Sequence, residues 1–244
     1  MKKGLFISIE GPDGSGKTTQ INLLRDFLID NNVYDFEILF TREPGGTTIG
    51  EKIRDIILDN SHTEMDDLTE AMLYAAARAQ HVEEVIKPAL REGKLVICDR
   101  FVDSSIAYQE YGRNLGENVS TINKIAVNHT MPYRTIFIDL DPELARNRIE
   151  ESVSHNTVLC SNTNMTNSGT SSEQFNNDGG RTHLDRLELE KLSFHQNVYD
   201  GYKKIISKNR ERFVVVDGRG SIDEIQLRIR NTLLQICKEF LEEE

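Results

Sequence analysis

The residues with the clearest chemistry form one short run near the start of the chain. Residues 11–18 spell G-P-D-G-S-G-K-T, which fits G-x-x-x-x-G-K-T, between an apolar run and a helical pattern. In that context glycines let backbone N–H groups surround phosphate oxygens, and the helix N-terminus favours an anion. Lys17 can reach the β- and γ-phosphates, and Thr18 can place its hydroxyl on Mg²⁺. The run predicts a P-loop for ATP, with Gly11, Pro12, Asp13, Gly14, Ser15, Gly16, Lys17, Thr18 and Thr19 as the binding residues.

Two further strand ends add charged groups. Asp99 follows four apolar residues; alone it could simply end a strand, but beside a P-loop it is the candidate for Mg²⁺ or its water shell. Arg42, in T-R-E-P-G-G-T, and Arg100, in D-R-F, place two guanidinium groups on the expected ligand edge. Either arginine alone could form a structural ion pair, but two beside a P-loop indicate a second phosphate site.

Two pairs of helical residues extend this second site. Tyr74 and Arg78 are four residues apart, as are Ser104 and Tyr108, so each pair shares one helical face. An aromatic ring beside a guanidinium group suits a base that is stacked and bonded at its edge. Without the neighbouring motifs, both tyrosines would be interpreted as ordinary half-buried core residues.

The rest of the chain alternates short apolar runs with helical patterns, which predicts a three-layer α/β domain with a parallel sheet and ligands at the carboxyl ends of its strands. The five expected strands are Leu5–Glu10, Phe36–Phe40, Leu95–Cys98, Thr135–Asp139 and Phe213–Asp217. The expected helices are Lys17–Asn31, Thr47–Leu58, Asp66–Arg91, Asp103–Gly112, Glu117–Asn128, Pro142–Glu151, Leu184–Lys208 and Ile222–Phe240.

Composition limits the partners and the compartment. The 244 residues are compatible with a single domain, and the formal net charge of −11 argues against a polynucleotide-binding surface. Cys98, Cys160 and Cys237 are odd in number and form no CxxC pair, which fits a reducing compartment. No apolar run has membrane-spanning length and the start is not a signal peptide, so we expect a cytoplasmic protein without a membrane partner.

One segment departs from the alternating pattern. Between Ser152 and Gly180, 19 of 29 residues are Ser, Asn, Thr or Gly, which is too polar to offset the entropy of ordering a chain. We interpret residues 152–180 as an exposed, low-complexity insertion inside a lid around residues 146–190. A loop extension without function is favoured over a regulatory or partner-binding role.

Together these motifs resemble the thymidylate kinase family from Leu5 to about Ile206, apart from the insertion. The sequences GPDGSGKTT, TREPGGT, LYAAARAQH, DRFVDSSIAYQ and LDRLELEKLSFHQNVYDGY occur in the family's order. The resemblance implies a P-loop NTPase fold, a homodimer, Mg²⁺, and transfer of the ATP γ-phosphoryl group to dTMP. It implies a dTMP site formed by Asp13, Arg42, Tyr74, Arg78, Arg100, Ser104, Ser105, Tyr108 and Gln109.

The same resemblance assigns catalysis to Lys17, Arg100 and a lid arginine. Gly14 stands where one branch of the family has an arginine, so this chain resembles the bacterial-type branch, in which lid arginines serve the transition state. Arg181 is the first choice, ahead of Arg148 and Arg186. Tyr74 replaces the usual phenylalanine of the base-stacking position and adds a hydroxyl group.

Two other functions share part of this sequence pattern. A deoxynucleoside kinase also pairs a P-loop with a sugar-discriminating pocket, but it has no use for two arginines that bind an acceptor phosphate. A GTPase switch would use D-x-x-G, which residues 217–220 fit, but no N-K-x-D occurs. By analogy with the family, residues 217–221 are expected to line the adenine of ATP.

The lid assignment predicts a kinetic defect. An arginine that stabilises the transferred group contributes about 10³–10⁵ in rate in related reactions. We therefore expect Arg181→Ala to lower kcat far more than dTMP affinity in steady-state assays. A kcat within a few-fold of the unmodified enzyme would show that Arg181 is not the lid arginine.

Overall fold

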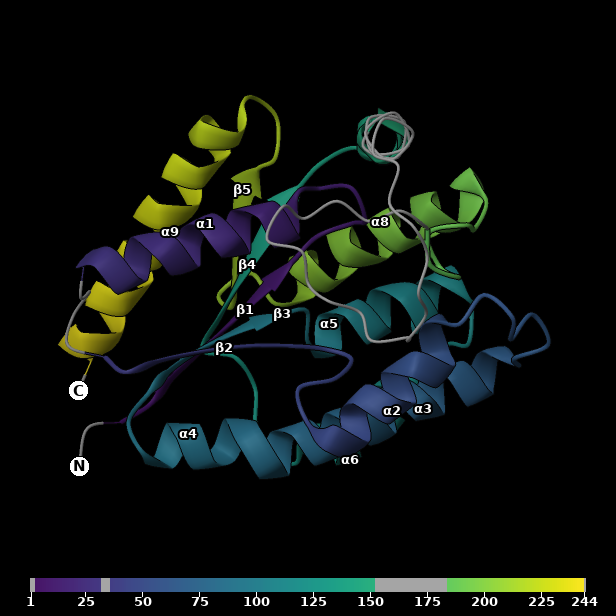
Figure 1. The fold of residues 1–244 in the computed structure, drawn as a ribbon, viewed down its shortest axis with the longest axis horizontal. Helices are drawn as coiled ribbons and strands as arrows, with labels where there is room; N and C mark the ends of the chain where they lie inside the picture. The colour runs from purple at the N-terminus through teal and green to yellow at the C-terminus, as the bar shows by residue number, and fades with distance from the viewer. Residues whose placement is uncertain (1–2, 32–35, 152–183, 244) are drawn as a thin grey trace, which may run out of the picture.

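Five parallel strands form the sheet at the centre of the molecule, in the order β2-β3-β1-β4-β5 (Figure 1). The computed structural model describes residues 3–31, 36–151 and 184–243. The strands are β1 (Leu5–Glu10), β2 (Ile38–Arg42), β3 (Leu95–Asp99), β4 (Arg134–Asp139) and β5 (Phe213–Asp217). The predicted α/β architecture with five parallel strands is confirmed.

Helices connect the strands, as the alternating sequence pattern predicts. They are α1 (Lys17–Asn31), α2 (Thr48–Leu58), α3 (Asp67–His81), α4 (Lys87–Arg91), α5 (Val102–Ser105), α6 (Asn118–Val127), α8 (Leu192–Lys208) and α9 (Ile222–Glu242), and residues 142–151 are also helical. Two predicted helices contain π-helical stretches, η2 (Val82–Ile86) and η3 (Ile106–Gly112). Thr47 and Asp66, predicted as first helical residues, instead cap α2 and α3 with their side chains.

Alternate side chains of the sheet face two helical layers. Leu5, Ile7 and Ile9 of β1 belong to a core cluster with apolar residues of α1 and α9. Phe6, between them, packs on the opposite face with residues of η2 and α4, where α8 and η3 extend the layer over β4 and β5. Figure 1 shows the same arrangement, with α1 and α9 together on one side of the sheet.

Most predicted boundaries lie within one or two residues of the observed ones, and two differ in a way that matters for the site. Strand β2 lies two residues later than predicted, because its register pairs Ile38 with Leu95 and Arg42 with Asp99. Residues 184–191 form turns instead of the first part of a helix. Asp185 causes this turn locally, because its Oδ1 accepts the N–H groups of Leu187 and Glu188 at 3.0 and 2.9 Å.

The pairing of β1, β2 and β3 places the predicted site residues at one edge of the sheet. Asp99 at the end of β3 pairs with Ile9 of β1 on one side and with Arg42 of β2 on the other. The P-loop follows β1 directly, so the loop, Arg42 and Asp99 meet at the carboxyl ends of adjacent strands. This is the edge where ligands bind in open α/β sheets.

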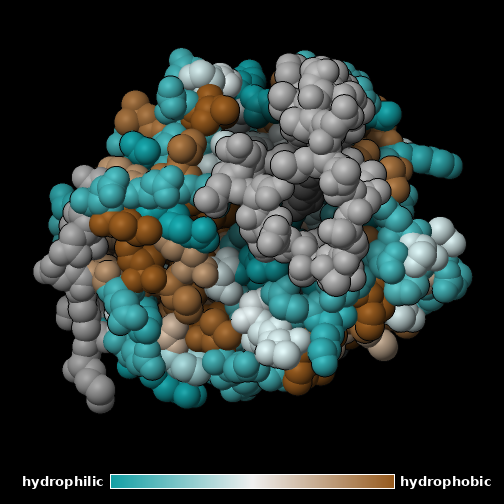
Figure 2. Space-filling view, viewed as in Figure 1, coloured by the Kyte–Doolittle hydropathy of each residue, from teal (hydrophilic) through white to brown (hydrophobic). Residues whose placement is uncertain are grey.

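Hydrophilic side chains dominate the face of the molecule shown in Figure 2, with separate hydrophobic patches between them. Among residues 3–31, 36–151 and 184–243, no helix is long and apolar enough to cross a bilayer.

A buried ion pair connects α5, the helix that follows Arg100, to the start of β5. Arg212, just before β5, donates through Nη1 to Asp103 Oδ2 at 2.6 Å and through Nη2 to Asp103 Oδ1 at 2.7 Å. Asp103 of α5 is fully buried. The pair therefore fixes the start of α5, and with it the backbone of Arg100.

Arg212→Met should destabilise the fold because it leaves the Asp103 charge buried without its partner. We expect a loss of about 3 kcal/mol in the free energy of unfolding, measured by urea titration. Arg210→Met is the matched control, since Arg210 is exposed, and it should change stability by less than about 0.5 kcal/mol. Equal effects of the two substitutions would contradict the role given to the ion pair.

Candidate active site

The P-loop connects β1 to α1 through two glycines in the left-handed region. Gly14 has φ +77° and Gly16 has φ +89°. A Cβ atom at Gly14 would lie 2.2 Å from the carbonyl oxygen of Ala145, whereas a Cβ at Gly16 would meet nothing within 4 Å. The loop is thus closed at Gly14 by the helix of residues 142–151 and open beside Gly16.

Lys17 lies inside this loop. Its Nζ donates to the carbonyl oxygens of Gly11 at 2.9 Å and Pro12 at 2.8 Å, and its side chain is buried. Burial, and next the positive charge of Arg100, lower the pKa of Lys17 to about 8. The amine is therefore poised to take up or release a proton near neutral pH.

Asp99 has the properties of a group that faces a cation. Its Oδ1 is buried and has no hydrogen-bond partner among the residues that the structure describes. Thr18, at the start of α1, is exposed. No group of three or more His, Cys, Asp or Glu side chains within the described ranges could hold a metal. The donor set suits Mg²⁺, which is bound through one or two protein groups together with phosphate oxygens and water.

Arg100 reaches from β3 across to the P-loop. Its Nη1 donates to Gly11 O at 3.1 Å and to Ser104 Oγ at 3.1 Å, and its Nη2 pairs with Asp13. Its backbone has φ +65°, a conformation that is costly for a residue with a side chain. Arg42, half-buried at the end of β2, donates to Glu51 at 2.7 Å.

Asp13 joins the loop to the predicted sugar site. The Tyr108 hydroxyl donates to Asp13 Oδ2 at 2.7 Å, while Asp13 Oδ1 pairs with Arg100. Burial opposes ionisation of Asp13, but the charges of Arg100 and Lys17 outweigh it and keep the pKa of Asp13 below its ordinary value. Asp13 is therefore a carboxylate, which accepts hydrogen bonds but does not donate them.

Arg78 is held almost entirely by the protein. Its Nε donates to Glu43 at 2.7 Å, Nη1 donates to Ser105 and Asn123, and Nη2 donates to Phe101 O at 3.2 Å. These bonds use four of the five N–H groups of the guanidinium. At most one N–H of Arg78 remains to contact a base, and Ser105 serves to position Arg78.

The other predicted base-site residues lie on the two facing helices. Tyr74 of α3 is half-buried, and burial raises the pKa of its hydroxyl. Gln109 of η3 is buried and donates through Nε2 to Glu70 Oε1 at 2.9 Å, whereas its Oε1 has no partner among the described residues. Ser104 is occupied by Glu10, at 2.6 Å, and by the Tyr202 hydroxyl, at 2.9 Å.

Comparisons with known proteins place this chain in a family. The family model described as thymidylate kinase matches residues 9–167. A thymidylate kinase of Bacillus licheniformis is 44% identical over 97% of this chain and 98% of its own length, and one of Clostridium novyi is 39% identical over 96% and 100%. The chain belongs to the thymidylate kinase family. The crystal structure of the enzyme from Ehrlichia chaffeensis has a TM-score of 0.65 and 29% identity, covering 95% of this chain and 99% of that one, and it confirms the predicted P-loop NTPase fold.

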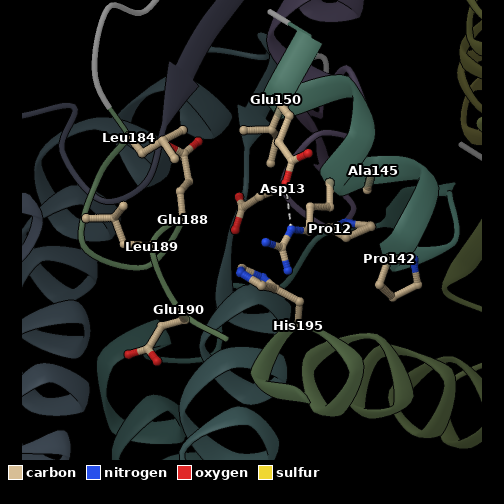
Figure 3. A pocket seen from close by; sticks show the side chains of 12 residues that line it. Pro12, Asp13, Pro142, Ala145, Glu150, Leu184, Glu188, Leu189, Glu190 and His195 are labelled. Atoms are coloured by element: carbon tan, nitrogen blue, oxygen red, sulfur yellow. Dashed lines mark hydrogen bonds and ion pairs between the residues drawn. The ribbon is translucent and has the colours of Figure 1, made fainter. Parts of the chain in front are cut away.

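In this thymidylate kinase family member, a pocket lies beside the P-loop (Figure 3). Pro12 and Asp13 form one wall, the helix of residues 142–151 forms another, and the segment from Leu184 to Glu190 faces them together with His195. Figure 3 shows Glu150, Glu188 and Glu190 around this opening. The pocket therefore connects the phosphate loop with the segment that follows the insertion.

The three candidate lid arginines have different positions. Arg181 and the insertion, residues 152–180, lie outside the described residues. Arg148 donates to Gly218 O at 3.1 Å, which places it beside the expected adenine turn. Arg186 turns away from the P-loop and donates to Ile57 O at 3.1 Å and to Glu70.

Sequence reasoning missed the buried carboxylates that hold this site. Glu10 accepts from Phe101 N at 2.7 Å and from the Tyr202 hydroxyl at 2.9 Å, and Glu43 bonds both Arg78 and His81. Burial, and next the charge of Asp103, raise the pKa of Glu10 to about 7. Glu70 lies four residues before Tyr74 on the same helical face, but this spacing alone does not separate it from a surface glutamate.

Nucleotide binding near pH 8 should be accompanied by proton uptake. With a pKa of about 8, roughly half of the Lys17 side chains are neutral at that pH, and bound phosphates would favour the charged form. Calorimetry in buffers with different ionisation enthalpies should show uptake of up to about 0.5 proton at pH 8 and less at pH 6.

Lys17→Arg is the matched control for this measurement. A guanidinium group stays charged at both pH values. Nucleotide binding to this variant should therefore not be accompanied by the proton uptake expected at pH 8. Equal proton counts for the two proteins at pH 8 would contradict the assignment to Lys17.

Proposed function

We propose that this chain transfers the γ-phosphoryl group of ATP to dTMP and forms dTDP. The observation that carries the proposal is the placement of Arg42 and Arg100 at the ends of adjacent strands, beside the P-loop. Two guanidinium groups at this edge suit an acceptor that already carries a phosphate. Membership of the thymidylate kinase family supports dTMP as that acceptor.

In this proposal the site needs no general base. The second pKa of a phosphate monoester is about 6, so the attacking oxygen of dTMP is already ionised near neutral pH. Catalysis then consists of alignment and charge neutralisation. Arg42 and Arg100 would hold the acceptor phosphate, while Lys17 and a lid arginine, with Arg181 first, would stabilise charge on the transferred group.

The donor side would combine residues 11–19 with Arg148 and the turn of residues 217–221. Thr18 and Asp99 would hold Mg²⁺, and the buried Oδ1 of Asp99, which has no partner within residues 3–31, 36–151 and 184–243, supports this role. The ion would neutralise phosphate charge when it is bound.

On the acceptor side, Tyr74 would stack on the base, and the Arg78 N–H that bonds no described residue would bond its edge. Gln109 would offer its carbonyl oxygen, and Tyr108 with Asp13 would bound the sugar and favour deoxyribose. In contrast to the first expectation from the sequence, Ser104 and Ser105 would act by positioning Arg100 and Arg78.

We further propose a single P-loop kinase domain over residues 1–244, with its lid around residues 146–190, that works as a homodimer in the cytoplasm. Exposed apolar side chains on neighbouring helices support the dimer: Ile49 and Ile56 of α2, Leu68 and Met72 of α3, and Ile125 of α6. Figure 2 shows hydrophobic atoms in the lower part of the view, where Figure 1 places these helices. Buried, unpaired thiols at Cys98 and Cys237 are consistent with a reducing compartment.

A coupled assay of ATP consumption with dTMP and with thymidine tests the acceptor. We expect turnover with dTMP and little with thymidine, since Arg42 and Arg100 bind a phosphate. Faster turnover of thymidine would overturn the proposal in favour of a deoxynucleoside kinase.

Arg42→Met tests the same point within the site. It should lower kcat/KM for dTMP by about 10- to 100-fold, because one charge-assisted contact is lost. Residual activity with thymidine should change little. An equal loss with both acceptors would show that Arg42 does not recognise the acceptor phosphate.

A further inference from the structure

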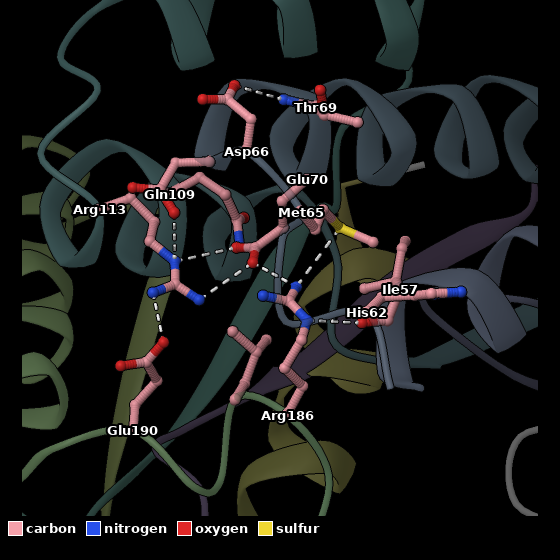
Figure 4. Close-up of polar contacts among 12 residues, drawn as sticks. Ile57, His62, Met65, Asp66, Thr69, Glu70, Gln109, Arg113, Arg186 and Glu190 are labelled. Carbon is pink, nitrogen blue, oxygen red and sulfur yellow. Dashed lines mark hydrogen bonds and ion pairs between the residues drawn. The ribbon is translucent and has the colours of Figure 1, made fainter. Parts of the chain in front are cut away.

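Glu70 is a fully buried carboxylate that none of the roles above uses. Figure 4 shows three side chains converging on it, two from η3 and its end and one from the segment of residues 184–190. Gln109 donates to Oε1 at 2.9 Å, Arg113 donates to Oε2 at 3.1 Å, and Arg186 donates to Oε2 as well. A carboxylate with this many donors and no exposure is a fixed acceptor.

The position of Glu70 relates it to the base site. Glu70, Tyr74 and Arg78 lie at intervals of four residues on α3, so they share one helical face. Across from them on α5 and η3, Ser105 bonds Arg78 and Gln109 bonds Glu70. Tyr74 therefore lies between two cross-links, one to each side of the ring that would stack on the base.

The carboxylate determines how the Gln109 amide is turned. Because an ionised carboxylate only accepts hydrogen bonds, the NH₂ group of Gln109 must face Glu70 and the carbonyl oxygen must face away. That Oε1 atom is buried and has no partner among the described residues. A buried acceptor without a donor is costly, so this oxygen is suited to an N–H group of a ligand.

We propose that Glu70 is a positioning residue for base selection: it fixes the Gln109 amide so that only a pyrimidine with a ring N–H is accommodated. The inference rests on the proposed function. Thymine and uracil present an N–H beside a keto oxygen, which match the Gln109 carbonyl and the remaining Arg78 N–H. Cytosine presents an acceptor and an amino group at these places, so both contacts are mismatched.

Arg113 and Arg186 balance the charge of Glu70 in this arrangement. Two guanidinium groups offset the cost of burying a carboxylate, and they keep it a pure acceptor toward Gln109. Arg186 comes from the segment that follows the insertion, whereas Arg113 lies just after η3 and also contacts Glu190 of that segment. Glu70 and Arg113 thus connect η3 to the segment of residues 184–190, while the hydrogen bond between Glu70 and Gln109 alone orients the amide.

The test compares kcat/KM for dTMP and dCMP in three proteins: the unmodified chain, Glu70→Gln and Arg186→Met. A glutamine at position 70 can donate as well as accept hydrogen bonds. The Gln109 side-chain amide can then rotate, so that its oxygen and its NH₂ group exchange positions. We expect Glu70→Gln to lower the ratio of dTMP to dCMP activity by about 10- to 100-fold. Arg186→Met removes one ion pair but keeps the Glu70–Gln109 bond, so its ratio should stay within about threefold.

The exchanged pair Glu70→Gln with Gln109→Glu is the rescue variant. The glutamine would donate to the new carboxylate, whose second oxygen again offers an acceptor to the base. The preference for dTMP over dCMP should return in this variant. If Glu70→Gln alone does not fold, the exchanged pair is used to test the inference in its place.

Three outcomes would overturn the inference: an unchanged ratio in Glu70→Gln, an equal drop in Arg186→Met, or a folded exchanged pair without preference for dTMP. Failure of the proposed function is a separate result, because it would appear in the unmodified protein as poor turnover of dTMP relative to thymidine.

Discussion

The contact of Arg100 with the P-loop is the interaction on which the site depends. One guanidinium group bonds the carbonyl of Gly11, the hydroxyl of Ser104 and the carboxylate of Asp13, so this side chain links the P-loop to α5. Its left-handed backbone costs about 1–3 kcal/mol. Glu10 compensates locally, because it accepts the N–H of Phe101 at 2.7 Å and so holds the turn.

Buried carboxylates likewise hold other arginine side chains near the site in fixed positions. Glu43 holds Arg78, and Glu70 holds Arg186 while it orients Gln109. Each such pair is costly to bury and costly to break, so the guanidinium and amide groups have little freedom before a substrate arrives. Little reorganisation is then needed during phosphoryl transfer, which is the main advantage of a preorganised polar site.

The sequence was sufficient for the parts of the molecule that depend on local patterns. The P-loop, the five strands and the strand-end residues Arg42 and Asp99 follow from spacing and hydrophobic runs. The turn of residues 184–191 was missed because a side-chain bond of Asp185 overrides the helical pattern. Glu70 was missed because its partners Gln109 and Arg186 are 39 and 116 residues away, and a glutamate on an amphipathic helix has the pattern of a surface residue.

The most direct test of this account is the single-turnover rate of Arg100→Met at saturating ATP and dTMP, with folding checked by thermal unfolding. If Arg100 serves both the donor loop and the acceptor phosphate, the rate should fall by about 100-fold or more even at saturation. An unchanged rate at saturation, with only the affinity for dTMP reduced, would contradict the account and leave Arg100 as a binding residue.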